Sequence, residues 1–406
     1  MIENPKMVKI KHVIFLCTMS LTFGISFLQV YSVSATDRFV KKSMLVAKKQ
    51  SVLMADYMSQ YPDRLPGTYY QKPDSVFIVD SKHWVSGFFP GTLWYLYEYH
   101  KSKQIKDIAI EFLSRVEKEK YNTYDHDIGF QINCSFGNAY RITKNENYKN
   151  VLLTAAQSAT KRYNAKTGLI RSWDFGKNKW QFPVIIDNMM NLELLMRAFH
   201  LSSDSLYYRI AVSHADNTMK NHFRPDYSCY HVVSYDTITG LPHVKMTHQG
   251  AFNESHWARG QAWALYGFTM MYRETGFQKY LTHAVNIANF LIHHPNMPED
   301  RIPYWDLLAA DIPNSYRDAS AAAIMASALI ELSGFVDKKL KSDFLRVAKT
   351  QLKTLSGADY LAKPGTNGFF ILKHSVGNLP RGYEIDVPLS YADYYFLEAL
   401  IRYNNL

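Results

Sequence analysis

Helical segments in this chain alternate between short and long connections. Apolar residues recur at i, i+3, i+4 and i+7 in twelve segments, which is the spacing of an amphipathic helix. Links after the even-numbered segments are short and polar, whereas most links before them are long. This alternation predicts six helical hairpins, with helices near residues 37–60, 88–102, 104–119, 128–142, 148–163, 184–200, 204–221, 257–276, 279–294, 318–335, 338–356 and 390–404.

Similar hairpins can bury their apolar faces only against one another. A weak repeat supports similar units, because an aromatic residue is followed eight positions later by Ala in three outer segments: Tyr148/Ala156, Tyr207/Ala215 and Tyr280/Ala288. The last segment, 390–404, is as apolar as the interior ones, which favours a closed ring over a solenoid with a polar cap. We therefore predict an all-α fold, an (α/α)6 barrel of six helical hairpins. The inner helices would all start at one end, under the long loops. A helical solenoid is the alternative.

The N-terminus has the pattern of a secretory signal peptide. Lys6, Lys9 and Lys11 precede an uncharged run over residues 13–30, and the small residues Ser34 and Ala35 follow it. A membrane anchor is the alternative, because the run is long for a signal peptide. We expect residues 1–35 to be a signal that is removed on export to the periplasm, and residues 36–406 to form a single barrel domain without membrane association.

Charge and cysteine content narrow the class of partner. The net charge is +10, a mild excess that suits acidic ligands, and there is no Lys/Arg run typical of nucleic-acid binding. Cys134 and Cys229 remain after signal removal, and neither has the spacing of a metal ligand. We expect two buried thiols, with one disulfide as the alternative, and neither a metal site nor a cofactor.

Five loops rich in Trp, Tyr, Asp and Gly run directly into predicted helices. The first turn of a helix has unpaired N–H groups and the positive end of the helix dipole. If these helix starts face a common centre, they surround one site suited to an anion. The segments are residues 84–91, 125–130, 185–192, 255–263 and 316–320.

Asp127 and Asp187 are the strongest catalytic candidates, because each stands at the predicted start of an inner helix. An Asp in that position is ordinarily an N-cap. However, residues 125–127 place two carboxylates and an imidazole together, and Asp187 is flanked by apolar residues. Two carboxylates in one dry site cannot both ionise cheaply, so one keeps its proton near neutral pH. Such a carboxyl can serve as general acid and then as general base.

Other residues offer groups for recognising a sugar acid. Arg259 and Trp263 are four residues apart on one helix, where a guanidinium fork would lie beside an aromatic plate. The alternatives are a surface ion pair for Arg259 and core packing for Trp263. The loop over residues 221–257 adds polar groups, and loop tryptophans can stack on sugar rings. The remaining candidates are His231, Gln249, Trp84 and Trp173.

These segments resemble the unsaturated glucuronyl hydrolases, glycoside hydrolase family 88. The motifs occur in the same order over essentially the whole mature chain: Trp84 to Gly91, residues 126–130, 185–187 with 191–192, 257–263 and 386–395. The resemblance implies a barrel hydrolase that acts on Δ4,5-unsaturated uronyl disaccharides, which polysaccharide lyases release from glycosaminoglycans. It implies Asp187 as acid/base and Asp127, directly before Ile-Gly-Phe, as its partner. The implied substrate contacts are Trp84, Trp173, His231, Gln249, Arg259 and Trp263.

The resemblance also implies a mechanism, hydration of the C4=C5 enol ether rather than attack at the anomeric carbon. Three other functions stay open: an unsaturated rhamnogalacturonyl hydrolase of the same fold, a polysaccharide lyase with an α/α toroid, and a non-catalytic glycan-binding protein. The basic residues Lys373, His374 and Arg381 in the last long loop favour a sulfated disaccharide.

Overall fold

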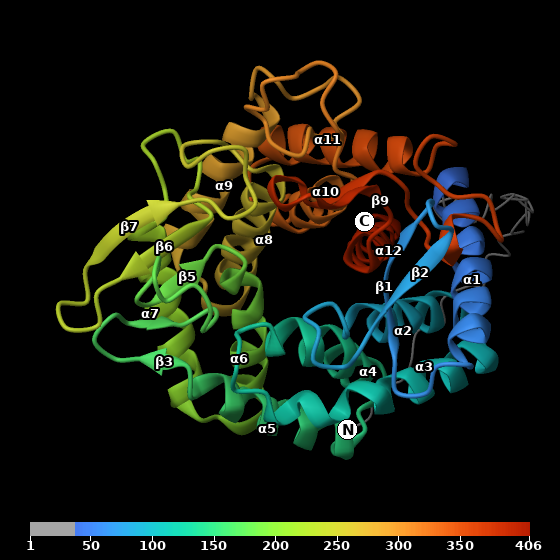
Figure 1. The fold of residues 1–406 in the computed structure, drawn as a ribbon, viewed down its shortest axis with the longest axis horizontal. Helices are drawn as coiled ribbons and strands as arrows, with labels where there is room; N and C mark the ends of the chain where they lie inside the picture. The colour runs from blue at the N-terminus through green and yellow to red at the C-terminus, as the bar shows by residue number, and fades with distance from the viewer. Residues whose placement is uncertain (1–36) are drawn as a thin grey trace, which may run out of the picture. The chain divides into compact units, whose positions relative to one another are not determined.

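The helices of residues 37–406, the part of the chain that the computed structural model describes, form two rings (Figure 1). The outer ring contains α1 (Arg38–Met58), α3 (Lys103–Val116), α5 (Glu146–Thr160), α7 (Ser205–Asn221), α9 (Gln278–Ile292) and α11 (Lys338–Leu355). The inner ring contains α2 (Phe88–His100), the π-helix η2 (Gly129–Gly137) continued by α4 (Asn138–Thr143), α6 (Asn188–Ser202), α8 (Ala258–Thr275), α10 (Ala319–Leu332) and α12 (Ser390–Asn404). The predicted (α/α)6 barrel is confirmed. The expected signal segment lies outside the described residues.

The inner ring closes on itself. Each inner helix contacts the next, and the last, α12, contacts both α10 and α2. Because closure surrounds α12 on both sides, its residues are buried from Ser390 to Leu400. This burial explains why the terminal segment is as apolar as the interior ones. The solenoid alternative is therefore wrong.

Inner and outer helices differ in how much of their surface is buried. In α10, every residue from Ala319 to Ile330 is buried, and most of them are small or aliphatic. In α11, by contrast, a single stripe is buried, and the rest of the surface is mostly charged or polar. An amphipathic helix covers a core, whereas a helix that is apolar all round lies inside one. The sequence pattern thus distinguishes the two rings.

Two inner segments begin differently from the predicted helices. The segment 128–142 opens as the π-helix η2, in which Gly129 lies against α6 so closely that an added Cβ would be 2.4 Å from Asn191 Oδ1. The segment 184–200 opens as strand β5 and becomes helical only at Asn188. Both departures occur where a long loop enters the inner ring, so they decide which groups face that end of the barrel.

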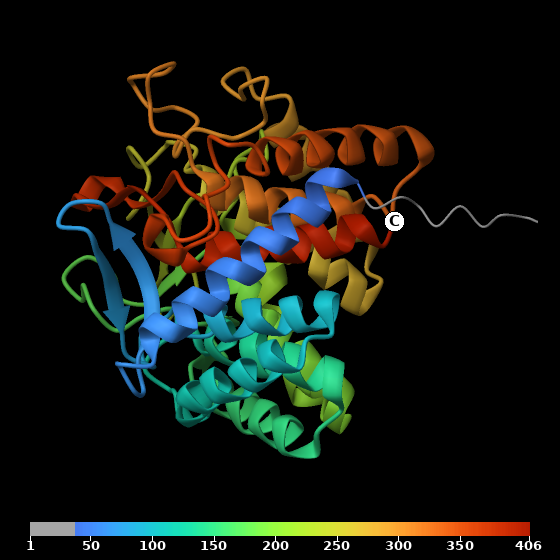
Figure 2. The same ribbon diagram turned by 90° about the vertical axis from the view of Figure 1, so that its right-hand side faces the viewer.

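Short antiparallel strands occur in the long loops. A three-stranded sheet of order β5-β6-β7 lies across the barrel axis from the β1–β2 and β8–β9 hairpins (Figure 1). The turned view in Figure 2 shows the β1–β2 hairpin standing at one end of α1. The strands are β1 (Leu65–Tyr70), β2 (Ser75–Val79), β3 (Tyr163–Asn164), β4 (Leu169–Ile170), β5 (Pro183–Ile185), β6 (Val232–Tyr235), β7 (Pro242–Met246), β8 (Ser375–Asn378) and β9 (Tyr383–Val387).

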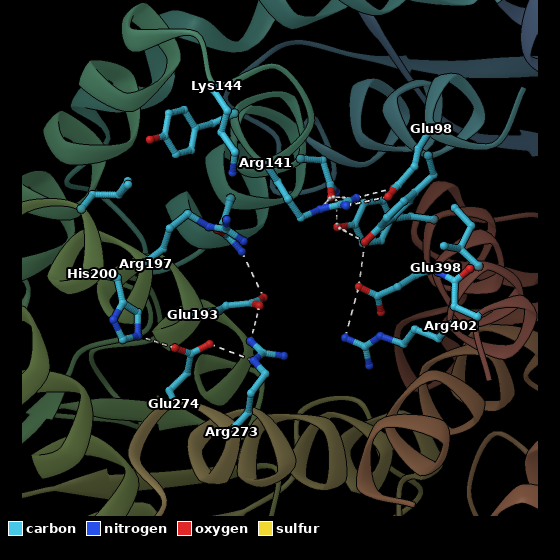
Figure 3. Close-up of a pocket in the computed structure, with 18 residues that line it drawn as sticks. Glu98, Arg141, Lys144, Glu193, Arg197, His200, Arg273, Glu274, Glu398 and Arg402 are labelled. Atoms are coloured by element: carbon cyan, nitrogen blue, oxygen red, sulfur yellow. Dashed lines mark hydrogen bonds and ion pairs between the residues drawn. The ribbon is translucent and has the colours of Figure 1, made fainter. Parts of the chain in front are cut away.

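Ion pairs line the other end of the barrel, where the inner helices finish (Figure 3). Arg273 contacts the carboxylates of Glu193, Glu274 and Glu331, each within 2.8 Å. Cations near helix C-termini are favoured by the negative end of the dipole. A hollow of about 490 Å³ lies among these charges, and none of the predicted site residues lines it. The predicted site residues lie away from this hollow.

Both cysteines of the described residues, Cys134 and Cys229, are buried and unpaired. Burial raises the pKa of the Cys229 thiol to about 12. The expectation of two buried thiols is confirmed. Within residues 37–406, no helix combines the length and the apolar content needed to cross a bilayer.

Candidate active site

The long loops bring the starts of the inner helices together at one end of the barrel. The outer helices α5, α7 and α11 begin with capping side chains from Asn145, Asp204 and Asp337. The outer helices α1, α3 and α9 have no such cap, and among the inner helices α10 is capped by Asp318, whereas α2, α6, α8 and α12 are uncapped. Uncapped helix N-termini offer free N–H groups and a positive potential. This end of the barrel is therefore suited to an anionic ligand.

Asp187 lies directly before α6 and is buried, with 8% of its surface exposed. Its side chain makes no capping hydrogen bond, which removes the ordinary explanation for an Asp there. Its Oδ2 atom has no hydrogen-bond partner and lies 3.8 Å from His231 Nε2. Burial raises the pKa of Asp187 to about 7; the Asp127 charge adds to this rise, and the Arg259 charge opposes it. The carboxyl is thus set to hold a proton near neutral pH.

Asp127 lies two residues before η2, close enough to Asp187 for its charge to raise the pKa of that carboxyl. Burial raises the pKa of Asp127 to about 7, while the Asn191 side chain and the Arg162 charge lower it. Asn191 on α6 joins the two segments, because its Oδ1 accepts the Phe130 N–H and its Nδ2 donates to the Asp187 carbonyl. The two predicted catalytic carboxyls are therefore brought to one place.

Asp125 has a different role from Asp127. Its Oδ1 atom accepts the Asp127 backbone N–H at 2.9 Å and the Asn122 amide at 3.1 Å. Asp125 is thus the residue that organises this turn, which leaves the Asp127 carboxyl for other contacts.

His231 presents a neutral N–H to Asp187. Its Nδ1 atom accepts backbone N–H groups of His248 and Gln249, at 3.1 and 3.2 Å. Because Nδ1 accepts, the proton of the neutral ring is on Nε2, the atom nearest Asp187. Burial holds the pKa of His231 well below its ordinary value, and the charges of His248 and Arg259 lower it further. His231 is therefore a hydrogen-bond donor rather than a cation.

Arg259 is fully buried, but its fork does not point to an open position. Nη1 donates to the Val376 carbonyl and pairs with Asp318 at 3.3 Å, while Nη2 donates to the Gly377 carbonyl at 2.7 Å. Of its nitrogens, only Nε has no partner. The expectation of a carboxylate fork and the surface ion pair are both corrected, because β8 closes over α8 and takes the terminal nitrogens. Arg259 still supplies a buried positive charge beside Asp187.

Gln249 also binds strand β8. Its Nε2 atom donates to the Gly377 carbonyl at 3.2 Å. Two residues that were expected to contact substrate directly thus converge on one carbonyl of β8. The sequence does not reveal this contact, because Gly377 lies more than a hundred residues further along the chain.

The three candidate tryptophans have different exposure. Trp263 is completely buried against Phe130 and Tyr395, so its ring is not an open plate, and the core-packing alternative describes it correctly. Its indole nevertheless helps to lower the pKa of Asp187. Trp84 is partly buried, at 4.9 Å from the Tyr391 ring. Trp173 is partly buried as well.

Trp173 is stacked on Phe175, with ring centroids 4.7 Å apart and planes at 15°. One face of Trp173 is therefore covered, and the half-exposed Phe175 extends the aromatic surface. Phe175 was not among the predicted site residues, although it lies two residues after a Trp in a loop.

Several of the buried polar atoms that lack a hydrogen-bond partner belong to residues at this end of the barrel. Buried polar atoms are normally paired, so a group of orphaned ones indicates a place for ligand or water. They come from the loops and from the starts of α6, α8 and α12: Trp173 Nε1, Asp187 Oδ2, His231 Nε2, Arg259 Nε, Trp263 Nε1 and Tyr391 OH. No cluster of three or more His, Cys, Asp or Glu side chains placed to hold a metal occurs among residues 37–406.

Asp318 and Tyr391 were also missed as site residues. Asp318 caps α10 and pairs with Arg259, and the Tyr391 ring lies 5.3 Å from the Arg259 guanidinium. Both lie in segments that the sequence singles out, residues 316–320 and 386–395, and each stands at the start of a predicted inner helix.

We predict that Arg259→Lys loosens β8. Lys keeps the charge but lacks the planar fork that holds two carbonyls, so the strand loses one of its anchors. Hydrogen exchange of residues 375–378 should become faster. Activity should fall about 10- to 100-fold, because β8 is no longer held firmly beside the site. Arg346→Lys, at an exposed ion pair on α11, is the matched control. Unchanged exchange in β8 would contradict the anchoring role.

Comparison with known proteins identifies similar proteins over most of the chain. A model of Glycosyl Hydrolase Family 88 matches residues 57–404. An unsaturated glucuronyl hydrolase from Formosa agariphila is 46% identical over 392 residues, which cover 95% of this chain and 97% of that protein.

Solved structures give the same result. The crystal structure of an unsaturated glucuronyl hydrolase specific for heparin is 48% identical, with a TM-score of 0.87, and the match covers 91% of this chain and 98% of that one. A mutant unsaturated glucuronyl hydrolase from Streptococcus agalactiae, complexed with dGlcA-GalNAc6S, is 29% identical with a TM-score of 0.76. That match covers 90% of this chain and 92% of that one.

Proposed function

Because this chain belongs to glycosyl hydrolase family 88, we propose that its Asp127–Asp187 site hydrolyses Δ4,5-unsaturated uronyl disaccharides. Such disaccharides arise when polysaccharide lyases cut glycosaminoglycans. The observation that carries the proposal is the pair of buried carboxyls, both with a pKa of about 7, among orphaned polar atoms at the inner-helix starts. An anionic sugar finds uncapped helix N-termini and the buried Arg259 charge there.

The reaction is the hydration of an enol ether. Asp187 in its acid form donates its proton to C4, and the ring oxygen stabilises the positive charge that develops at C5. The Asp187 carboxylate then takes a proton from the water that attacks C5. The resulting hemiketal opens and the second sugar leaves. One carboxyl thus acts as general acid and then as general base, and it ends the cycle protonated as it began.

The neighbouring residues prepare Asp187 for this cycle. The Asp127 charge favours the protonated form of Asp187, whereas the Arg259 charge favours the carboxylate left after proton donation. The Nε2–H of His231 lies where it can donate to the Asp187 carboxylate or to substrate. Trp84, Trp173 and Phe175 offer apolar surface for sugar rings.

Turnover should depend on pH through Asp187. The acid form is needed, and the pKa of Asp187 is raised to about 7, so kcat/KM should be lost as the pH rises through about 7. A carboxyl with an ordinary pKa would lose its proton below pH 5. Initial rates on one disaccharide between pH 4 and 9 measure this limb. A fall already complete at pH 5 would contradict the assignment.

The direct test is an assay on lyase-generated disaccharides from several glycosaminoglycans. Hydration consumes the conjugated C=C bond, so absorbance near the enol-ether band falls with time. An α/α-toroid lyase would instead create this absorbance from intact polymer, and a glycan-binding protein would bind without changing it. Unsaturated rhamnogalacturonan disaccharides in the same panel distinguish the sister activity. The relatives' names, unsaturated glucuronyl and chondroitin disaccharide hydrolases, support glycosaminoglycan products.

We also propose that the enzyme is exported and acts in the periplasm, where imported polysaccharide fragments would reach it. The charged and apolar pattern of residues 1–35 supports this proposal. N-terminal sequencing of the protein from the cell envelope should begin at Thr36. A protein that retains Met1 would favour the membrane anchor.

A further inference from the structure

Glu384 on β9 lies across the neighbouring strand at a glycine. Residues Val376 and Ile385 are paired, as are Asn378 and Tyr383, so Gly377 and Glu384 are opposite each other. Glu384 Oε2 is only 1.9 Å from the position that a Cβ at Gly377 would take. Gly377 therefore leaves the space that the Glu384 side chain fills.

Gly377 is also the residue of the β8–β9 hairpin to which two side chains of the site bind. Arg259 and Gln249 both donate to the Gly377 carbonyl. The Arg259 charge lowers the pKa of Asp187 and also that of Glu384, so both carboxyls are within electrostatic reach of one guanidinium. Glu384 is thus a further acidic group at the active end of the barrel, contributed by the last long loop.

The Glu384 carboxylate is not committed to another residue. Among residues 37–406, no hydrogen bond or ion pair involves it, because β8 and Asp318 occupy the terminal nitrogens of Arg259. Burial raises the pKa of Glu384 to about 7. Glu384 is only partly buried, so its unpaired carboxyl can accept a hydrogen bond from a ligand.

Glu384 is ionised above its raised pKa, and in that form its charge decides which part of a disaccharide can lie against it. The unsaturated uronic ring carries a carboxylate, which Glu384 would repel. The released hexosamine offers hydroxyl and N–H donors instead. A sulfate on that sugar would place two anions together in a poorly hydrated position, where like charges are costly.

We infer that Glu384 is a specificity-determining residue, which accepts a hydrogen bond from the released sugar and disfavours sulfate on the position that faces it. The inference rests on the proposed function and deepens it. It also refines the expectation drawn from Lys373, His374 and Arg381. Lys373 donates to the Ala358 carbonyl and His374 pairs with Asp386, so neither is free to select sulfate.

Arg381 differs from those two residues. Its charge lowers the pKa of His248, so it lies on the His248 side of the site. The discrimination against sulfate is therefore positional: sulfate is disfavoured where Glu384 lies and remains compatible with the side near Arg381.

The test compares substrates that differ only in the released sugar. The probes are the unsaturated uronyl–N-acetylhexosamine disaccharide and its forms sulfated at O4, O6 or N. In Glu384→Gln, kcat/KM for at least one sulfated form, relative to the unsulfated one, should rise about tenfold, mainly through a lower KM. Asp386→Asn removes a carboxylate from the same strand, and its ratios should stay within about twofold of wild type. Thermal melting checks that both variants fold.

A second variant displaces the Glu384 side chain without substituting Glu384 itself. Gly377→Ala puts a Cβ where Oε2 now lies and displaces the side chain, so the ratios should move in the same direction as in Glu384→Gln. If the wild type hydrolyses the disaccharides but neither variant changes any ratio, the inference is wrong and the proposed function stands. If the wild type hydrolyses none of the probes, the proposed function itself fails, and the inference fails with it.

Discussion

Asp187→Asn should abolish turnover on a Δ4,5-unsaturated disaccharide while leaving the barrel folded. An amide cannot donate a proton to C4 or accept one from water, so the variant loses both halves of the cycle. General acid–base groups contribute about 10²–10⁴-fold, and one residue that performs both steps should lie at the upper end. The loss should appear in kcat, with little change in disaccharide affinity measured by calorimetry.

Stability should move in the opposite direction. The pKa of Asp187 is raised in the folded protein, so between about pH 4 and 7 the folded state binds more protons than the unfolded state. Stability therefore falls as the pH rises through this window, because a buried carboxyl must ionise. Asn removes that cost. The melting temperature of Asp187→Asn should equal or exceed that of the wild type at pH 8.

Two results together would identify the role. Lost activity with an unchanged or higher melting temperature supports a catalytic carboxyl. Lost activity with a strongly lowered melting temperature would show that Asp187 is structural, and turnover near the wild-type rate would remove it from the mechanism. Asp204→Asn, at the cap of an outer helix, is a control that changes an Asp outside the site.

Most of the fold could be predicted from local sequence patterns. The 3.6-residue periodicity and alternating link lengths depend on neighbours in sequence, so they predicted the two rings. The apolar residues 390–404 predicted ring closure in the same way. The π-helix over Gly129–Gly137 escaped prediction, because its cause is a close approach to Asn191 on another helix.

From the sequence, catalytic candidates could be predicted only where they stand at the start of a predicted helix. Asp127 and Asp187 were predicted because each stands at the start of a predicted inner helix, and the barrel brings those starts together. The partners of Arg259 were not found, because Val376 and Gly377 approach it only after the last loop folds over α8. Every residue has a backbone carbonyl, so the sequence does not show which carbonyls bind a side chain. An Arg whose guanidinium is bound by carbonyls therefore cannot be distinguished in the sequence from an Arg whose guanidinium is free. Glu384 was missed for a related reason, since its importance depends on a facing glycine.

Asp127→Asn should lower activity by about 10²-fold or more and should also shift the pH profile. The charge of Asp127 raises the pKa of Asp187, so a neutral Asn at position 127 lets Asp187 lose its proton more easily. The alkaline fall in kcat/KM should therefore move to lower pH in the residual activity of the variant. A rate loss without this displacement would mean that Asp127 acts on the substrate rather than through Asp187.

Asp125→Asn is the matched control for that experiment, two residues away on the same turn. Asn retains an Oδ1 acceptor for the Asp127 N–H, so the turn should persist and activity should stay within about tenfold of wild type. Burial raises the pKa of Asp125 to about 6, so its neutral form already resembles the amide near that pH. If Asp125→Asn were inactive and Asp127→Asn active, the two residues would exchange roles. The partner of Asp187 would then be the carboxylate that the structure places in the turn.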